Sequence, residues 1–338
     1  MERSGIQSGD RVLVTGATGF TGRVLTRKLC ERGAEVVAIA RPSSDLEPLA
    51  DCHIQWLLGD VADPDLVAKA AQNVNYVFHM ATAYREARSS PDVYHRVHVS
   101  STQHLARAVL DNDSFKRFVH VSTIGVHGHI EGAPADETHP FRPGDEYQAT
   151  KAEAEKWIAD FARESGMPYT IVRPVGIYGP GDRRLLKFFR MAAGGNVLLL
   201  GSGAGAYHLV HVEDLTDMML QLAAHPDADG EAFICGARDA TTLAEIARIV
   251  GVELNRRIRI IRLPAWPFFI VAALCEGICK PLRIEPPLYR RRVAFFTKDR
   301  KFDTGKVFRT LDYAPVHPVE DGIRQTTRWY VNQGWISA

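Results

Sequence analysis

An α/β fold, with a doubly wound parallel sheet and a smaller C-terminal region, is predicted by three features of the sequence. Short strand-like runs alternate with helical patterns of about ten or more residues through the first half of the chain. The first strand-like run ends in a glycine-rich turn, and after Pro174 the rhythm changes as Gly and Pro become frequent. We expect a main domain in residues 1–175, to which 207–236 return, and a smaller substrate-binding region in 176–206 and 237–338.

The elements of the main domain follow from hydrophobic pattern and β-branched content. Strands are expected at residues 11–15, 35–40, 54–59, 73–80, 115–122 and 168–174. Helices are expected at 20–32, from near Pro64, from near Asp92 and around Tyr147. Two later runs, 208–212 and 231–236, look like strands that return to the main sheet. Parallel sheets bind ligands at the carboxyl ends of their strands, so the functional residues are expected there.

Composition limits the classes of partner. The 338 residues are 46% hydrophobic and 24% charged, which is ordinary for a globular protein, and the net charge of +1 indicates neither a nucleic-acid nor a membrane-surface partner. The amino-terminal MERSGIQSGD has no apolar stretch of the secretory kind. The five Cys show no metal-type spacing, so we expect free thiols and no bound metal. Free thiols, with no secretory stretch, fit a cytoplasmic location. The expected partner is a small molecule.

One segment, from Leu263 to Leu282, is unusually apolar. Its apolar core at 265–275 is interrupted by Glu276 and is shorter than the ~20 apolar residues of a spanning helix, so no membrane span is expected. We expect a helix that roofs the substrate cleft above Thr123 and Tyr147, or that at most touches a membrane.

The turn TGATGFTG at residues 15–22 places Gly16, Gly19 and Gly22 three residues apart, between the first strand and the first helix. The first glycine permits a tight turn, the second lets the backbone approach a pyrophosphate, and the third allows close packing of helix on sheet. The helix N-terminus then faces the negative charge. This context predicts a Rossmann-type dinucleotide site.

Tyr147 and Lys151 lie four residues apart in DEYQATKAEAEKW, which puts them on one face of a helix. On its own such a pair is typical of a solvated helix. Beside a dinucleotide site it indicates chemistry, because an ammonium group near a phenol favours the phenolate form and makes the tyrosine a better proton carrier.

At this point the chain resembles the extended short-chain dehydrogenase/reductase family. The matching pieces are TGATGFTG, LLGDVAD, VFHMATA, VHVSTIGVHG, YQATK and RPVGIYGPGD, which occur in the family's order. The resemblance implies that Thr123 holds the substrate oxygen, that Lys151 also holds the ribose hydroxyls, and that a dimer forms through the helix of Tyr147. The catalytic residues it implies are Thr123, Tyr147 and Lys151.

The same resemblance, with the glycine turn, assigns the remaining contacts. The expected cofactor contacts are Gly16, Gly19, Phe20, Thr21, Gly22, Arg41, Asp60, Val61, Ala81, Tyr147, Lys151 and Pro174. The expected substrate contacts are Ala83, Tyr84, Arg183, Lys187 and Tyr207.

The residue after the second strand favours NADP over NAD. Selectivity for NAD usually needs an acidic residue about 20 positions beyond the glycines, bonded to the ribose 2′-hydroxyl. Here the strand ends in Ala40 and Arg41 follows. Arginine pairs with a 2′-phosphate, although a solvated Arg41 beside bound NAD is the alternative.

Departures from the family narrow the reaction. In its sugar-nucleotide dehydratases an Asp and a Glu follow the catalytic threonine, whereas Ile124 and Gly125 stand here, so dehydration is not expected. A motif that usually carries Asn reads His98-Val99-Ser100 at this point. That puts a local backbone contact in doubt and leaves the fold prediction intact.

Three functions remain open. The first is a reductase or dehydrogenase of a secondary alcohol or ketone, with a lipophilic, steroid-like substrate suggested by the apolar segment. The second is a nucleotide-sugar epimerase with retained NAD. In it, a diphosphate is expected to be clamped by Arg183, Arg184 and Lys187, or by Arg291 or Arg292. The third is a dinucleotide-sensing protein without activity, which the presence of Thr123, Tyr147 and Lys151 disfavours.

Overall fold

A computed structural model describes residues 5–83, 91–130, 132, 134–201, 203, 205–279, 286–288, 290, 293 and 301–337. Its main feature is a seven-stranded sheet in the order β11-β6-β5-β4-β1-β2-β3, in which every neighbouring pair is parallel. These strands are β1 (Arg11–Thr15), β2 (Glu35–Ala40), β3 (Ile54–Leu58), β4 (Tyr76–His79), β5 (Arg117–Val121), β6 (Tyr169–Pro174) and β11 (Glu231–Cys235). The α/β fold with a doubly wound parallel sheet is confirmed.

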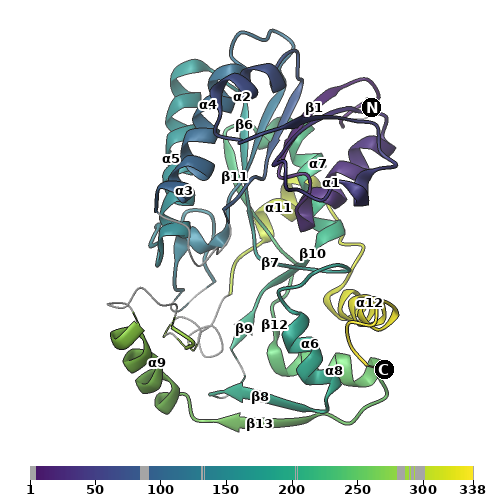
Figure 1. The fold of residues 1–338 in the computed structure, drawn as a ribbon, viewed down its shortest axis with the longest axis vertical. Helices are drawn as coiled ribbons and strands as arrows, with labels where there is room; N and C mark the ends of the chain where they lie inside the picture. The colour runs from purple at the N-terminus through teal and green to yellow at the C-terminus, as the bar shows by residue number, and fades with distance from the viewer. Residues whose placement is uncertain are drawn as a thin grey trace.

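Alternating side chains on the strands bury both faces of the sheet. Val12 and Val14 pack on one side of β1 with α1 and α7, while Leu13 packs on the other side with α2, α4 and α5. Figure 1 shows these two layers of helices, with the sheet between them. The helices of the two layers are α1 (Phe20–Glu31), α2 (Pro64–Ala70), α3 (Pro91–His95), α4 (Ser101–Ala108), α5 (Glu146–Ser165) and α7 (Val212–Ala224). Short helical turns are η1 (Glu47–Leu49), η2 (Arg96–Ser100), η3 (Ile124–His127) and η4 (Pro226–Ala228).

A second group of elements lies beyond the carboxyl ends of the strands (Figure 1). It has its own core, in which α6 and α8 pack with α12 around Phe189, Leu199 and Ile246. Its elements are β7 (Gly176–Tyr178), α6 (Leu186–Ala193), β8 (Asn196–Leu200), β9 (Ala206–Tyr207), β10 (Leu209–His211), β12 (Thr241–Thr242), α8 (Leu243–Glu253), β13 (Arg259–Leu263), α9 (Trp266–Cys279) and α12 (Val319–Asn332).

The chain passes between the two groups several times. The late strand β11 joins the main sheet beside β6, as expected for residues 231–236. The expectation that residues 208–212 also join it is wrong, because β10 pairs with β7 in a two-stranded sheet of its own. After α9 and before α12, α11 (Gly305–Leu311) returns to the main sheet, where Val307 and Phe308 pack in the core with α7 and β11.

The apolar segment forms α9, so the predicted helix is confirmed. The helix and its flanking residues pack against Leu200, Leu263 and Val293, while Trp266 and Ile270 are exposed. These contacts do not place α9 over Thr123 and Tyr147. Within the described ranges, no helix combines the length and apolarity that a bilayer crossing requires.

Candidate active site

The glycine turn after β1 is packed so closely that side chains do not fit. Gly16 has φ +79°, and a Cβ there would lie 2.9 Å from the carbonyl carbon of Met80. A Cβ on Gly22 would lie 2.0 Å from the carbonyl oxygen of Gly16. The turn therefore brings bare backbone to the carboxyl end of β1, as a phosphate-binding loop requires.

The first helix begins at this turn with its amino end open. Gly19 is the N-cap, no side chain caps the helix, and no acidic residue stands in its first turn, which begins with Phe20 and Thr21. The uncapped N–H groups and the helix dipole suit a pyrophosphate. The residues present thus fit a dinucleotide.

The ends of β2 and β3 supply the expected adenosine side of the site. Arg41 follows β2 and is exposed. Asp60 accepts a hydrogen bond from the Ala62 amide at 2.9 Å and also pairs with Arg96 of η2. Val61 is half-buried beside it. The partnership with Arg96 is a contact that the sequence pattern alone did not reveal.

Two buried residues lie at the carboxyl end of the sheet. Ala81 donates its amide N–H to the Thr15 hydroxyl at 3.1 Å, which fixes the chain after β4 against the end of β1. Pro174 is buried at the carboxyl end of β6. Both therefore lie at the edge of the sheet where the ligand is expected.

Lys151 joins the helix of Tyr147 to the strand that leads to Thr123. Its side chain is 2% exposed, and Nζ donates a hydrogen bond to the carbonyl oxygen of Val121 at 3.0 Å. Val121 ends β5, two residues before Thr123. Lys151 lies one turn after Tyr147 on α5, so this bond brings the Tyr–Lys face to the carboxyl end of β5.

Thr123 caps the turn η3 and retains a free proton to donate. Its Oγ1 accepts the Gly125 amide N–H at 3.1 Å, so the hydroxyl hydrogen remains available to an oxygen of a ligand. A Cβ on Gly125 would lie 3.0 Å from the Gln148 side chain, which shows that η3 packs against the first turn of α5.

The buried ammonium of Lys151 has a buried carboxyl group, Glu155, near it. Burial lowers the pKa of Lys151 to about 8, and the charge of Glu155, one turn further along α5, opposes that effect. The Glu155 carboxylate accepts hydrogen bonds from Nε and a terminal nitrogen of Arg173 at 2.9 and 2.7 Å. Lys151, Glu155 and Arg173 thus form a buried chain of alternating charge. The four-residue spacing of Lys151 and Glu155 could have indicated it.

His98 is a neighbour of Ala83 and Tyr147 that the sequence pattern does not indicate. Its Nε2 accepts the Ala83 amide N–H at 3.2 Å, so the neutral ring carries its proton on Nδ1, which donates to the Thr150 hydroxyl at 2.8 Å. Its ring meets that of Tyr147 edge-on, with centroids 5.3 Å apart. Burial, aided by the nearby charge of Lys151, lowers the pKa of His98 to about 2. His98 lies on η2, a π-helical turn, and such turns are frequent at functional sites.

The expected substrate contacts are only partly gathered. A Cβ on Gly176 would lie 3.3 Å from the Tyr207 hydroxyl, which brings Tyr207 near the end of β6. Ala83 lies against His98, whereas the Arg183 guanidinium stacks on Trp335 at 5.2 Å.

Four residues give less information about this site. Lys187 is exposed on α6. Tyr84, with Arg291 and Arg292, lies outside the described residues.

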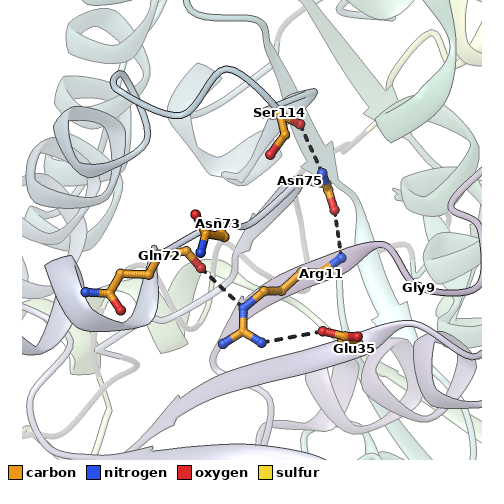
Figure 2. A pocket seen from close by; sticks show the side chains of 7 residues that line it. All are labelled: Gly9, Arg11, Glu35, Gln72, Asn73, Asn75 and Ser114. Carbon is orange, nitrogen blue, oxygen red and sulfur yellow. Dashed lines mark hydrogen bonds and ion pairs between the residues drawn. The ribbon is translucent and has the colours of Figure 1, made fainter.

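A surface hollow lies elsewhere on the molecule and has a volume of about 580 Å³. Figure 2 shows the side chains that line it. Its lining residues are Gly9, Arg11, Glu35, Gln72, Asn73, Asn75 and Ser114. Arg11 and Glu35 begin β1 and β2, so the hollow lies at the amino ends of the strands. Ligands of parallel sheets bind at the other end, and we do not assign it to the cofactor.

Within the part of the chain that the structure describes, no three His, Cys, Asp or Glu side chains gather as a metal site would require. His127 is buried and donates from Nδ1 to the His139 carbonyl at 2.8 Å. Its Nε2 faces Arg173 at 3.3 Å, and burial with that cation lowers the pKa of His127 to about 4.

Comparison with known proteins agrees with this geometry. The model of the NAD dependent epimerase/dehydratase family matches residues 12–236. A 3beta-hydroxysteroid-dehydrogenase/decarboxylase (isoform 2) of Arabidopsis thaliana is 30% identical over 93% of this chain, which spans 61% of that relative's length. A UDP-glucose 4-epimerase of Vibrio cholerae is 25% identical over 96% of this chain and 98% of its own. The crystal structure of gox2253 matches with a TM-score of 0.81 at 28% identity, over 97% of this chain and 100% of the other.

The family match covers the glycine turn and the helix α5, which carries the Tyr147–Lys151 pair. The chain therefore belongs to the NAD-dependent epimerase/dehydratase family, within the extended short-chain dehydrogenases/reductases, and is an NAD(P)-dependent oxidoreductase.

Proposed function

We propose that this protein interconverts a secondary alcohol and a ketone on a lipophilic substrate, with Thr123, Tyr147 and Lys151 as catalytic residues. The observation that carries the proposal is the hydrogen bond from Lys151 to the Val121 carbonyl. It ties the Tyr147 helix to the strand end that bears Thr123, at the edge of the sheet where the glycine turn receives a dinucleotide.

Each residue then has one task. When bound, the nicotinamide supplies or takes up a hydride at the carbinol carbon. Tyr147 moves a proton to or from the substrate oxygen, and Thr123 donates a hydrogen bond to the same oxygen. Lys151 uses one N–H on Val121 and keeps two for ribose hydroxyls, while its charge favours the phenolate of Tyr147.

We further propose NADP as the preferred cofactor. Arg41 follows Ala40, the last residue of β2, where an NAD-selective protein places an acidic side chain. A guanidinium at that position provides bidentate hydrogen bonds for a 2′-phosphate. We also propose the other cofactor and substrate contacts that the sequence predicts. The proposed domains are a main domain of residues 1–175 with 207–236, and a smaller substrate region of 176–206 and 237–338.

The choice of a lipophilic substrate rests on two observations. A plant relative is named for a 3β-hydroxysteroid. Arg183, one of the residues expected to clamp a diphosphate, stacks on Trp335. The second candidate function is an epimerase with retained NAD, and the test includes it because a bacterial relative is named UDP-glucose 4-epimerase. A cytoplasmic location and a dimer through α5 are part of the proposal.

The test has two measurements. Small molecules released from the purified protein are identified by mass spectrometry. Turnover of 3β-hydroxysteroids with NADP or NAD is followed by the absorbance of the reduced nicotinamide, whereas epimerisation of UDP-glucose, which leaves no net reduced cofactor, is followed by chromatography of the sugar nucleotides. Exchangeable NADP with steroid turnover supports the proposal. Tightly retained NAD, with UDP-glucose epimerised and steroids inert, replaces it with the epimerase.

A further inference from the structure

The helix α9 presents a row of large apolar side chains to solvent. Trp266, Ile270, Leu274 and Ile278 are 68%, 53%, 61% and 64% exposed. They recur every fourth residue, so they form a single stripe along one side of the helix. Soluble surfaces carry isolated exposed apolar residues, whereas a continuous stripe marks a surface that contacts another molecule.

The opposite side of α9 holds it to the protein and removes its only charge from the stripe. Ala272 is fully buried in a small cluster with Leu200. Glu276 is the one charged residue in the helix, and its side chain is 13% exposed. It accepts hydrogen bonds from the backbone N–H of Arg290 at 2.8 Å and from its Nε at 3.1 Å. The stripe is therefore uninterrupted by charge.

The stretch of sequence around α9 is the most basic in the protein. Residues 256–301 contain twelve Lys and Arg but only three Asp and Glu, although the whole chain has a net charge of +1. Arg259 and Arg262 of β13 are exposed, and β13 leads directly into α9 at the margin of the molecule (Figure 1). The described Arg259 and Arg262 therefore place positive charge at the strand that precedes the helix with the apolar stripe.

We propose that α9 is an interfacial helix that docks the protein on an anionic lipid surface. Its fourteen residues extend about 21 Å, which is too short to cross a hydrocarbon core of ~30 Å but suits a helix lying in the plane of the interface. The stripe enters the acyl region, and the flanking arginines meet lipid phosphates. A two-fold contact with a second copy would bring the same basic segment against itself, so charge favours the lipid.

The experiment is cosedimentation of the full chain with vesicles of phosphatidylcholine alone and of phosphatidylcholine with phosphatidylglycerol. We expect binding to the mixed vesicles that weakens as salt is raised, with a blue shift of tryptophan emission that is lost in Trp266→Tyr. Absence of binding to the mixed vesicles overturns the proposal. Equal, salt-independent binding to both kinds of vesicle overturns it as well.

A pair of double variants separates the stripe from general surface apolarity. Ile270→Glu with Leu274→Glu should weaken vesicle binding by about tenfold or more per side chain, because each loses the transfer of a large apolar group. Leu110→Glu with Val252→Glu, exposed apolar positions on other elements, should bind like wild type. If the α9 variant binds equally well, the stripe is not the docking face.

Size-exclusion chromatography with light scattering tests the second copy as occupant. A dimer that the α9 variant dissociates, together with absent vesicle binding, would assign the stripe to self-association and overturn the proposal. The inference does not depend on the substrate, since vesicle binding is measured without turnover.

Discussion

Replacing Lys151 by Met should stabilise the protein without cofactor while it removes function. The ammonium of Lys151 is buried, and its pKa falls from 10.5 to about 8, a penalty that corresponds to about 3 kcal/mol. Met fills a similar volume without a charge. The Val121 carbonyl loses its partner, at a cost of about 1 kcal/mol, and Glu155 keeps Arg173. We expect a net gain of about 1–2 kcal/mol in the free energy of unfolding at pH 7.

The pH dependence gives the sign of the effect. Below pH 8 Lys151 is protonated in both states, so the fold carries the whole penalty. Between pH 8 and 10.5 the folded state releases the proton that the unfolded state keeps, and stability from this group rises with pH. Lys151→Met should lack that rise, so the gain over wild type shrinks toward high pH.

Urea denaturation of both proteins at pH 7 and at steps up to pH 10 measures this difference, and comparison with wild type cancels the contribution of groups that do not interact with Lys151. The same samples titrated with NADPH should show much weaker binding to the variant. A variant that is less stable than wild type at pH 7, or that binds NADPH normally, would refute the assignment of a buried, cofactor-holding ammonium.

Three other substitutions test the site. Tyr147→Phe should reduce turnover by ~10²–10⁴-fold with cofactor binding largely kept, since only the proton-carrying hydroxyl is lost; a decrease of only a few-fold in steady-state rate would reject the role. Arg41→Asp should reverse the ratio of NADP to NAD dissociation constants, and an unchanged ratio would mean that Arg41 does not meet the 2′-phosphate. His98→Leu leaves the Ala83 amide without an acceptor and should cost about 1–3 kcal/mol in urea denaturation; an unchanged midpoint would contradict the bond.

The sheet and its dinucleotide turn could be predicted because local signals there agree with the tertiary structure. The expected strand at 11–15 is β1, and the expected strand at 35–40 is β2. The turn needs glycines because its backbone segments pack too closely for side chains. A Cβ on Gly22, for example, would collide with the Gly16 carbonyl oxygen. The spacing of the glycines is visible in the sequence. The helical spacing of Tyr147 and Lys151 is likewise a local property.

Long-range polar contacts could not be predicted in the same way. His98 joins Ala83 and Thr150, which come from separate segments, and nothing local in the sequence pairs them. The orientation of α9 could not be predicted either, because the sequence pattern of an apolar helix is the same whether its residues face a cleft or solvent. The stripe at Trp266 and Ile270 became visible only from their exposure.

The order in which the strands emerge during synthesis has a consequence for the nascent protein. β6 ends at Pro174, but its outer neighbour β11 begins only at Glu231, and α11, which packs on β11, ends at Leu311. Until the ribosome has released these later segments, β6 is the outer edge of an otherwise complete sheet, with a row of open hydrogen-bonding groups. During part of its synthesis the chain therefore exposes an unpaired strand edge that can pair with another chain. The yield of folded protein depends on whether the last third of the chain covers this edge before aggregation occurs.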